Sequence, residues 1–264
     1  EEREAFQLAI ELANQEDADL ILGTDPDADR VGAAVKDANG EYVILTGNQT
    51  GALLLEYILS QKQRKNELSS NGVVLKTIVT SELGREIAQR YGLVTIDTLT
   101  GFKFIGEKIK EFEQTGVHTF VFGYEESYGY LIGDFVRDKD AVQSCLLISE
   151  MAAFYKSKGV TLYQALQSLY ETYGYYLEEV SSITLKGIDG LERIRHITES
   201  LRNHPLTQIG DSRIKVISDY VTGVSRDVTA QTSKSTGLPE SNVLRYTLED
   251  ESWFAIRPSG TEPK

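Results

Sequence analysis

Three aspartates, each separated from the next by one residue, lie in a single short segment, Asp25-Pro-Asp-Ala-Asp-Arg30. Carboxylates this close repel one another unless a cation lies between them, and Mg²⁺ takes oxygen ligands while keeping positions open for water or phosphate. A calcium EF-hand is excluded, because its glycine and its bidentate glutamate would fall on Arg30 and Lys36. Asp25, Asp27 and Asp29 therefore predict a magnesium site, with Arg30 near the metal to offset part of the charge.

Two other interpretations of this acidic segment remain open. The order Asp27-Ala-Asp-Arg-Val31 after an apolar run matches the Asp-x-Asp-x-Thr/Val pattern of phosphatases that form an aspartyl-phosphate. In such an enzyme Asp27 would be the nucleophile. Asp and Pro also favour ordinary turns, but a turn does not require three carboxylates. The cation site is the preferred hypothesis.

A second polar segment, Arg257-Pro-Ser-Gly-Thr-Glu-Pro-Lys264, has the residue types of a phosphate-binding loop. The guanidinium of Arg257 can bind phosphate oxygens in a bidentate manner. Ser259 and Thr261 can donate hydroxyl groups, and Gly260 lets the backbone come close to an anion. An ordinary exit from a strand is the alternative.

A third segment, Gly123-Tyr-Glu-Glu-Ser-Tyr-Gly129, follows a strand predicted at 119–122. Ligands commonly bind at the ends of strands in α/β layers. Glu125 and Glu126 can accept hydrogen bonds from the hydroxyls of a sugar, and Ser127 can donate one. A solvated turn is the alternative.

Just downstream, Arg137-Asp-Lys-Asp140 lies where a helix is predicted to begin. Asp138 and Asp140 suit the positive end of a helix dipole, while Arg137 and Lys139 can face an anion. A solvated surface charge is the alternative for Lys139.

Alternating strand and helix patterns predict the elements that position these segments. Strands are expected at 19–23, 31–35, 42–45, 73–79, 93–97 and 119–122, and helices at 1–15, 51–60, 81–91, 102–113, 138–156 and 161–173. Further along, strands are expected at 180–185, 214–219, 243–248 and 253–257, with a helix at 189–201 capped by Asp189 and a mobile loop at 229–239. The fold class is therefore α/β with a mixed sheet, followed by a smaller α+β domain. We place the domains at 1–66, 67–174 and 175–264.

The composition of the chain limits the kinds of molecule that it is expected to bind. The formal net charge of −13 over 264 residues argues against nucleic acid or an anionic membrane, both of which need an excess of Lys and Arg. The single Cys145 and the lack of a long apolar run or a signal peptide favour a cytoplasmic protein. The absence of an initiator Met and the position of Lys264 inside a motif predict a piece of a longer protein.

In this order, the three segments resemble the α-D-phosphohexomutase superfamily, specifically its phosphoglucomutase and phosphomannomutase group. In that family the Asp-x-Asp-x-Asp-Arg loop binds Mg²⁺, a Gly-Glu-x-Ser loop recognises the sugar, and the Arg-Pro-Ser-Gly-Thr-Glu-Pro loop binds phosphate. Here Tyr124 stands where glycine usually precedes the glutamate. The resemblance implies further substrate loops at Thr100 to Lys103 and at Arg137 to Lys139, with Lys139 a candidate for proton transfer. It also implies that the chain holds the end of domain 2, all of domain 3 and most of domain 4.

The function that the resemblance implies is that of a bacterial α-phosphoglucomutase. Such an isomerase interconverts glucose 1-phosphate and glucose 6-phosphate through a phosphoserine and glucose 1,6-bisphosphate. The family's Ser-His-Asn-Pro type loop is missing, because no Ser-His pair occurs in this sequence. The nucleophile is therefore expected in a missing N-terminal domain, and the chain by itself is expected to be inactive. Phosphomannomutase or phosphopentomutase specificity, an aspartyl-phosphate hydrolase and a non-catalytic binding module remain alternatives.

Overall fold

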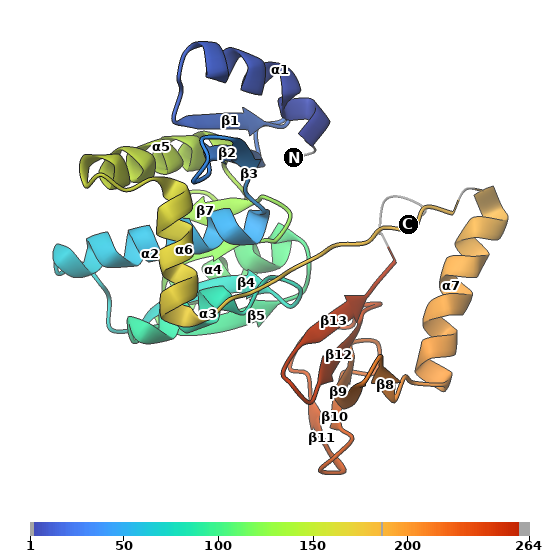
Figure 1. Ribbon diagram of the computed structural model, residues 1–264. Coiled ribbons are helices and arrows are strands. Elements are labelled where there is room, and N and C mark those ends of the chain that lie inside the picture. The colour runs from blue at the N-terminus through green and yellow to red at the C-terminus, as the bar shows by residue number, and fades with distance from the viewer. Residues whose placement is uncertain (1–2, 186, 259–264) are drawn as a thin grey trace. The chain divides into compact units, whose positions relative to one another are not determined.

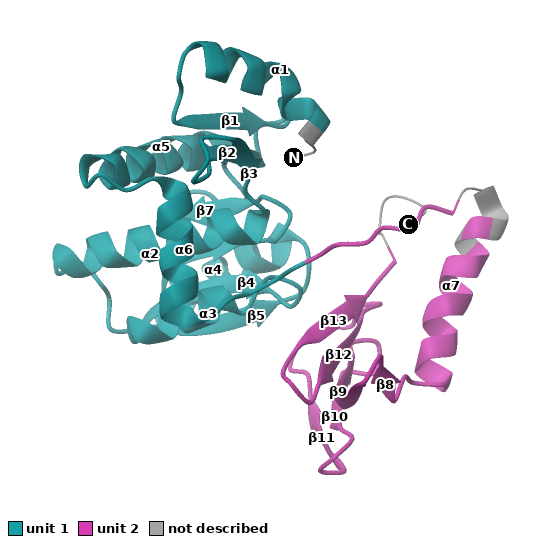
Figure 2. Cartoon of the chain, viewed as in Figure 1, with its two compact units in different colours: residues 1–178 teal, residues 179–264 magenta. Residues whose placement is uncertain are grey.

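The computed structural model describes residues 3–185 and 187–258 (Figure 1). The chain divides into two compact units, Glu1–Glu178 and Glu179–Lys264 (Figure 2). In chain order the first unit contains α1 (Arg3–Gln15), β1 (Leu20–Thr24), β2 (Val31–Lys36), β3 (Tyr42–Ile44), α2 (Gly47–Arg64), β4 (Gly72–Thr77), α3 (Leu83–Arg90), β5 (Val94–Thr98), α4 (Phe102–Thr115), β6 (Thr119–Tyr124), β7 (Tyr130–Ile132), α5 (Ala141–Ser157) and α6 (Leu162–Tyr173).

The acidic segment belongs to a small antiparallel sheet of order β1-β2-β3. It forms the turn between β1 and β2, which pair from Leu20 opposite Val35 to Thr24 opposite Val31. Helix α1 packs on this sheet, with Phe6 and other apolar side chains buried against it. The predicted amphipathic helix at the start of the chain is confirmed from Arg3 onward.

A second sheet has the order β5-β4-β6-β7, with parallel pairing of β4 to β5 and β6 and antiparallel pairing of β6 to β7. Successive residues of β4 face opposite layers, as the pleat of a strand requires. Val73 and Leu75 pack with α4, whereas Val74 packs in the larger core with α2, α3, α5 and α6. The predicted α/β class with a mixed sheet is confirmed.

Local signals set several helix starts. A capping box of Thr161 and Gln164 begins the predicted helix α6, and a second one of Thr46 and Gln49 begins α2. Helix α5 begins at Ala141, three residues later than predicted, because the Asp140 side chain accepts a hydrogen bond from the backbone of Gln143 at 2.9 Å.

The third segment differs from the prediction in extent. Strand β6 continues to Tyr124, and the chain returns at once as β7, a three-residue strand that the sequence pattern did not predict. A three-residue strand is too short to show an alternating hydrophobic pattern in the sequence. Only its pairing with β6 identifies it as a strand.

The second unit contains α7 (Gly187–Asn203), β8 (Gln208–Ile209), β9 (Ser212–Asp219), β10 (Val224–Asp227), β11 (Thr232–Ser235), β12 (Leu244–Leu248) and β13 (Trp253–Ile256). Its antiparallel sheet has the order β11-β10-β9-β12-β13, with β8 paired to β9. Leu201 of α7 packs against the apolar side chains of β9 and β12. This unit is the smaller α+β domain that was predicted.

Three predictions for this unit are wrong. Residues 180–185 form no strand, and Val180 and Ile183 are exposed, because no neighbouring strand pairs with them. The predicted loop at 229–239 contains strand β11. Its Ser- and Thr-rich composition indicated a loop, but backbone pairing with β10 makes the segment a strand. Helix α7 begins at Gly187, two residues before the predicted start, so position 189 lies inside its first turn. None of the helices in the described part of the chain has the length and apolar character of a membrane span.

Tyr124 is fully buried and needs two glycines on neighbouring helices. A Cβ at Gly51 would lie 2.3 Å from the Tyr124 ring, and one at Gly84 would lie 2.1 Å from the Tyr124 hydroxyl. That hydroxyl has no hydrogen-bond partner among the described residues, and burial raises its pKa. The two glycines thus make room for the large side chain at position 124.

We therefore expect Gly84→Ala to destabilise the chain by about 1–3 kcal/mol through overpacking. Tyr124→Phe removes an unsatisfied buried hydroxyl and should be neutral or stabilising. Urea denaturation of the combined Gly84→Ala, Tyr124→Phe variant should show relief of the strain, because the clash is with the hydroxyl. Gly51→Ala is the matched control: its clash is with a ring carbon, so Tyr124→Phe should not relieve it. Equal relief at both glycines would contradict this packing.

Candidate functional site

The aspartate cluster is built by the tight turn between β1 and β2. One oxygen of Asp25 accepts hydrogen bonds from the backbone N–H groups of Asp29 (3.1 Å) and Arg30 (3.0 Å), and the other accepts one from Nε of Arg30 at 2.9 Å. The turn includes Ala28 in a left-handed conformation, with φ of 55°. As a result Asp25, Asp27 and Asp29 each offer an oxygen, and these oxygens lie within 4.8 Å of one another.

The electrostatics of the cluster suit a hard cation. Burial acts to raise the pKa of Asp25, but the hydrogen bonds from Arg30 and Asp29 outweigh it and lower the pKa to about 2, so the carboxylate is ionised. Oδ1 of Asp29 is buried and accepts no hydrogen bond; Nε of Arg30 lies 3.5 Å from it. A buried carboxylate oxygen in this position fits a divalent cation such as Mg²⁺, which prefers oxygen ligands.

Lys139 lies directly beside the cluster. Its Nζ is 2.7 Å from Oδ2 of Asp29 and 3.5 Å from Oδ1 of Asp138. Its stem passes over Gly129, where a Cβ would lie 2.2 Å from Cδ of Lys139. Any larger residue at position 129 would displace the lysine from Asp29.

Backbone contacts join three distant segments around this point. The N–H of Ala141 donates to the carbonyl of Ala28 at 3.0 Å, and the N–H of Val31 donates to the carbonyl of Tyr128 at 3.2 Å. Arg30 and Gly129 also form an isolated antiparallel bridge. The aspartate turn between β1 and β2, the Glu-Glu-Ser loop and the start of α5 are therefore fixed to one another within the first unit.

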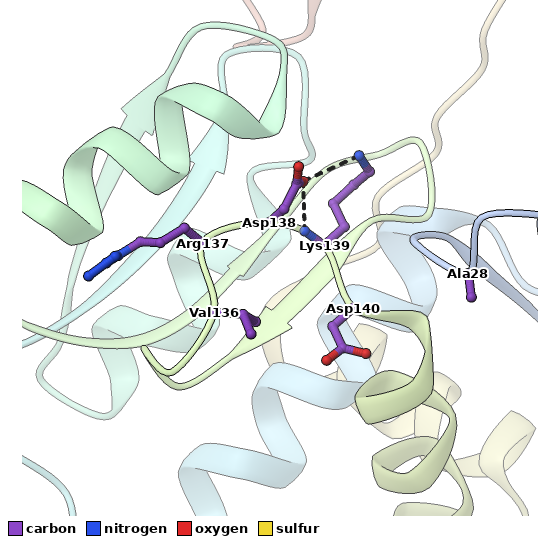
Figure 3. A pocket seen from close by; sticks show the side chains of 6 residues that line it. All are labelled: Ala28, Val136, Arg137, Asp138, Lys139 and Asp140. Atoms are coloured by element: carbon purple, nitrogen blue, oxygen red, sulfur yellow. Dashed lines mark hydrogen bonds and ion pairs between the residues drawn. The ribbon is translucent and has the colours of Figure 1, made fainter.

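An open pocket of about 390 Å³ borders the turn (Figure 3). It is lined by Ala28, Val136, Arg137, Asp138, Lys139 and Asp140. Figure 3 shows Arg137 directed away from Lys139. Arg137 forms an ion pair with Glu113 of α4, so of the two predicted cations only Lys139 lies at the aspartates.

The Glu-Glu-Ser loop presents its three polar side chains differently. Glu125 is buried, and its Oε1 accepts a hydrogen bond from the backbone N–H of Gly101 at 3.0 Å. Burial and the neighbouring charge of Glu126 raise the pKa of Glu125, which the Gly101 bond and Lys139 partly offset. Ser127 is exposed. The loop can therefore offer one held carboxylate and one free hydroxyl to a ligand.

The remaining predicted contacts are less closely grouped. Thr100 is half-buried just before Gly101, while Lys103 is exposed and its ammonium lies 4.8 Å from the Phe104 ring centroid. Arg257 is exposed and directly follows β13 in the second unit. Ser259, Gly260 and Thr261 lie outside the described residues.

Sequence reasoning missed two glycines of the site, Gly101 and Gly129. Gly101 has φ of 108°, a conformation that favours glycine, and its N–H is the donor to Glu125. The signal was available in part, since Gly101 and Gly129 stand at junctions between predicted elements. The partner that each glycine serves is distant in the chain and carries no local signal.

A mixed sheet with helices on both faces, joined to a hairpin that gathers three carboxylates beside a lysine, defines an α/β protein with a site suited to a divalent cation. Models of the phosphoglucomutase/phosphomannomutase alpha/beta/alpha domains II and III match residues 1–40 and 46–173. A phosphoglucomutase of Staphylococcus aureus strain bovine RF122 / ET3-1 is 41% identical over 264 residues, and that of strain MRSA252 is 40% identical.

The chain belongs to the phosphoglucomutase/phosphomannomutase family. Both alignments cover 100% of this chain and 47% of the relative, so the chain spans about half the length of these curated relatives. The fold also resembles the open form of the Paramecium phosphoglucomutase parafusin, with a TM-score of 0.57 and 20% identity over 92% of this chain and 38% of that one.

The cluster geometry predicts measurable cation binding. Asp27→Asn should weaken the binding of Mg²⁺ or Mn²⁺ by about tenfold or more, because it removes one of three converging charges. Titration calorimetry gives the affinity, and the rise in Tm on adding the cation gives a second measure.

Asp37→Asn is the matched control for this substitution. Asp37 accepts hydrogen bonds from the backbone of Asn39 and Glu41 in the β2–β3 turn but stands outside the cluster. An equal loss of cation affinity in both variants would show that the aspartate triplet does not bind the metal.

Proposed function

We propose that this chain supplies the metal-binding, sugar-binding and phosphate-binding parts of a phosphoglucomutase. The whole enzyme would interconvert glucose 1-phosphate and glucose 6-phosphate by way of a phosphoserine and a bound bisphosphate. One observation carries the proposal: Asp25, Asp27 and Asp29 converge beside Lys139 in a chain that aligns over its whole length with phosphoglucomutases.

The aspartate turn would hold Mg²⁺, which when bound would neutralise the charge that develops during phosphoryl transfer. Hydrogen bonds to Asp25 pre-form the turn, so the carboxylates need little rearrangement to accept the cation. Lys139 stands within reach of both Asp29 and the pocket, and we assign it a contact to the substrate phosphate or a proton transfer.

The Glu-Glu-Ser loop would hold the sugar. The Gly101 N–H donates to Oε1 of Glu125. A carboxylate has several acceptor sites on its two oxygens, so Glu125 can also accept a hydrogen bond from a sugar hydroxyl. Ser127 is exposed and can donate or accept. Two vicinal hydroxyls could bind this pair in either orientation of the sugar, as a reaction that exchanges its two ends requires.

Other groups would hold the phosphate that is not reacting. The proposed ligands are Arg257, Ser259, Gly260 and Thr261, with further contacts from Thr100, Lys103 and Arg137. A bidentate guanidinium together with backbone N–H groups is suited to a tetrahedral anion. The nucleophilic serine is proposed to lie in a part of the whole protein that this chain does not include.

The direct test is an assay of the whole protein against glucose 1-phosphate, mannose 1-phosphate and ribose 1-phosphate in parallel, with Mg²⁺. We expect the highest kcat/KM for glucose 1-phosphate, and a loss of activity of about a hundredfold or more in Asp27→Asn, since removing one electrostatic contact to a transition state costs this much. Arg64→Gln, an exposed substitution on α2, is the control and should retain activity. A higher kcat/KM for mannose 1-phosphate or ribose 1-phosphate would change the assigned substrate but not the proposed phosphoserine mechanism.

The isolated 264-residue chain should bind the cation yet show no mutase turnover, because it contains no phosphoserine loop. The competing hydrolase hypothesis makes the opposite prediction. It requires beryllium fluoride to be trapped on Asp27 and generic phosphate esters to be hydrolysed by the chain alone. Measuring the inorganic phosphate that the isolated chain releases from phosphate esters distinguishes the mutase from the hydrolase. Steady release of phosphate would overturn the mutase proposal.

A further inference from the structure

Two buried threonines hold the second glutamate of the sugar loop. Thr77 ends β4 and Thr80 lies in the turn that follows, and neither is exposed to solvent. The hydroxyl oxygen of each lies 3.1 Å from Oε2 of Glu126, and the two hydroxyl oxygens are 2.8 Å apart. Two hydroxyl protons serve these three short contacts, so at least one hydroxyl donates to the carboxylate in every arrangement.

A balanced network of charges shapes the turn that carries these hydroxyls. Lys76 is fully buried, and its Nζ donates to the carbonyls of Thr77 (3.3 Å) and Thr80 (3.0 Å). The same ammonium lies 3.2 Å from a carboxylate oxygen of Glu82 and 3.2 Å from one of Asp97. A buried ammonium with four acceptors is held in place, since leaving it unpaired would be costly.

Arg85 completes this network from α3. Its Nε donates to Glu82 at 2.8 Å, and its Nη2 donates to both oxygens of Asp97 at 2.6 and 2.7 Å. Lys76 and Arg85 therefore pair with Glu82 and Asp97, and this network holds the turn in place. The turn offers its hydroxyls from a rigid base, which is what a precise anchor needs.

The loop that bears Glu126 is confined from the other side as well. A Cβ at Gly47, the first residue of α2, would lie 2.1 Å from the carbonyl oxygen of Glu126. The adjacent Glu125 donates its N–H to the carbonyl of Gly129 at 2.9 Å. Glu126 is thus fixed at its backbone and its carboxylate, while Ser127, one residue on, is exposed.

We propose that Glu126 is a positioning residue and not a sugar contact: Thr77 and Thr80 hold its carboxylate so that Glu125 and Ser127 face the substrate. This inference rests on the proposed mutase function. It assigns the two charged residues of the loop to different tasks, because the oxygen of Glu126 that meets the threonines is already occupied by hydroxyl groups. Misplacement of the loop should weaken sugar binding while leaving the metal turn unaffected.

The test is a set of threonine substitutions in the whole protein. Thr77→Val with Thr80→Val keeps the side-chain shape and removes both hydroxyls; we expect KM for glucose 1-phosphate to rise about tenfold while kcat falls less than about threefold. The Mg²⁺ activation constant should stay at the wild-type value. Thr77→Ser with Thr80→Ser restores the hydroxyls and should return KM to within about twofold of wild type.

Thr50→Val is the matched control, because Thr50 is a fully buried threonine whose hydroxyl has no hydrogen-bond partner in the part of the chain that the structure describes. It should leave KM and kcat unchanged. If the double valine variant does not fold, the two single variants each retain one hydroxyl and should show smaller increases in KM. Amide hydrogen exchange provides a measure independent of turnover: the peptide over 124–130 should exchange faster in the valine variants than in Thr50→Val.

The possible outcomes distinguish failure of the positioning role of Glu126 from failure of the proposed mutase function. An active wild type whose valine variants match Thr50→Val in KM and in hydrogen exchange would overturn the positioning role alone. An increase in KM that the serine variants do not reverse would also overturn it, since the loss would then come from packing. A whole protein without mutase activity would overturn the proposed function, and the positioning role with it.

Discussion

Electrostatic repulsion among Asp25, Asp27 and Asp29 is the constraint around which the first unit is organised. The fold brings one oxygen of each carboxylate within 4.8 Å of the others and balances their charge with Arg30, which pairs with Asp25, and Lys139, which pairs with Asp29. Backbone N–H groups directed at Asp25 add further compensation. A site assembled in this way is poised for a divalent cation, because the cost of bringing the charges together has been met by folding.

The same constraint explains why the β1–β2 hairpin, the Glu-Glu-Ser loop and the start of α5 are joined. The contact of Ala28 with Ala141 and the bridge of Arg30 with Gly129 link segments about a hundred residues apart. If these contacts loosened, Lys139 would leave Asp29 and the negative charges would be less well balanced. The charge network around Lys76 has a comparable role beneath the Glu-Glu-Ser loop, because Lys76 is already paired with Glu82 and Asp97 in the folded chain.

Much of the fold could be predicted because its signals are local. The capping box at Thr161 and the alternation of strands and helices up to α6 depend on residues within a few positions of one another. The predicted strand at 180–185 was wrong for the complementary reason: a strand needs a partner, and its own apolar residues cannot reveal one. The domain boundary placed near residue 66 stays a prediction, although α2 packs with α5 and α6 inside one compact unit.

The sequence by itself determined which chemistry is available, since the spacing of the three aspartates is enough to bring their oxygens together in one turn. Only the tertiary structure decided which distant side chains meet them. It placed Lys139 on Asp29, paired Arg137 with Glu113, and bound Glu126 to threonines about fifty residues earlier in the chain. The physical reason is range: turn geometry is set by neighbouring residues, whereas the pairing of buried charges depends on how the sheet and its helices pack.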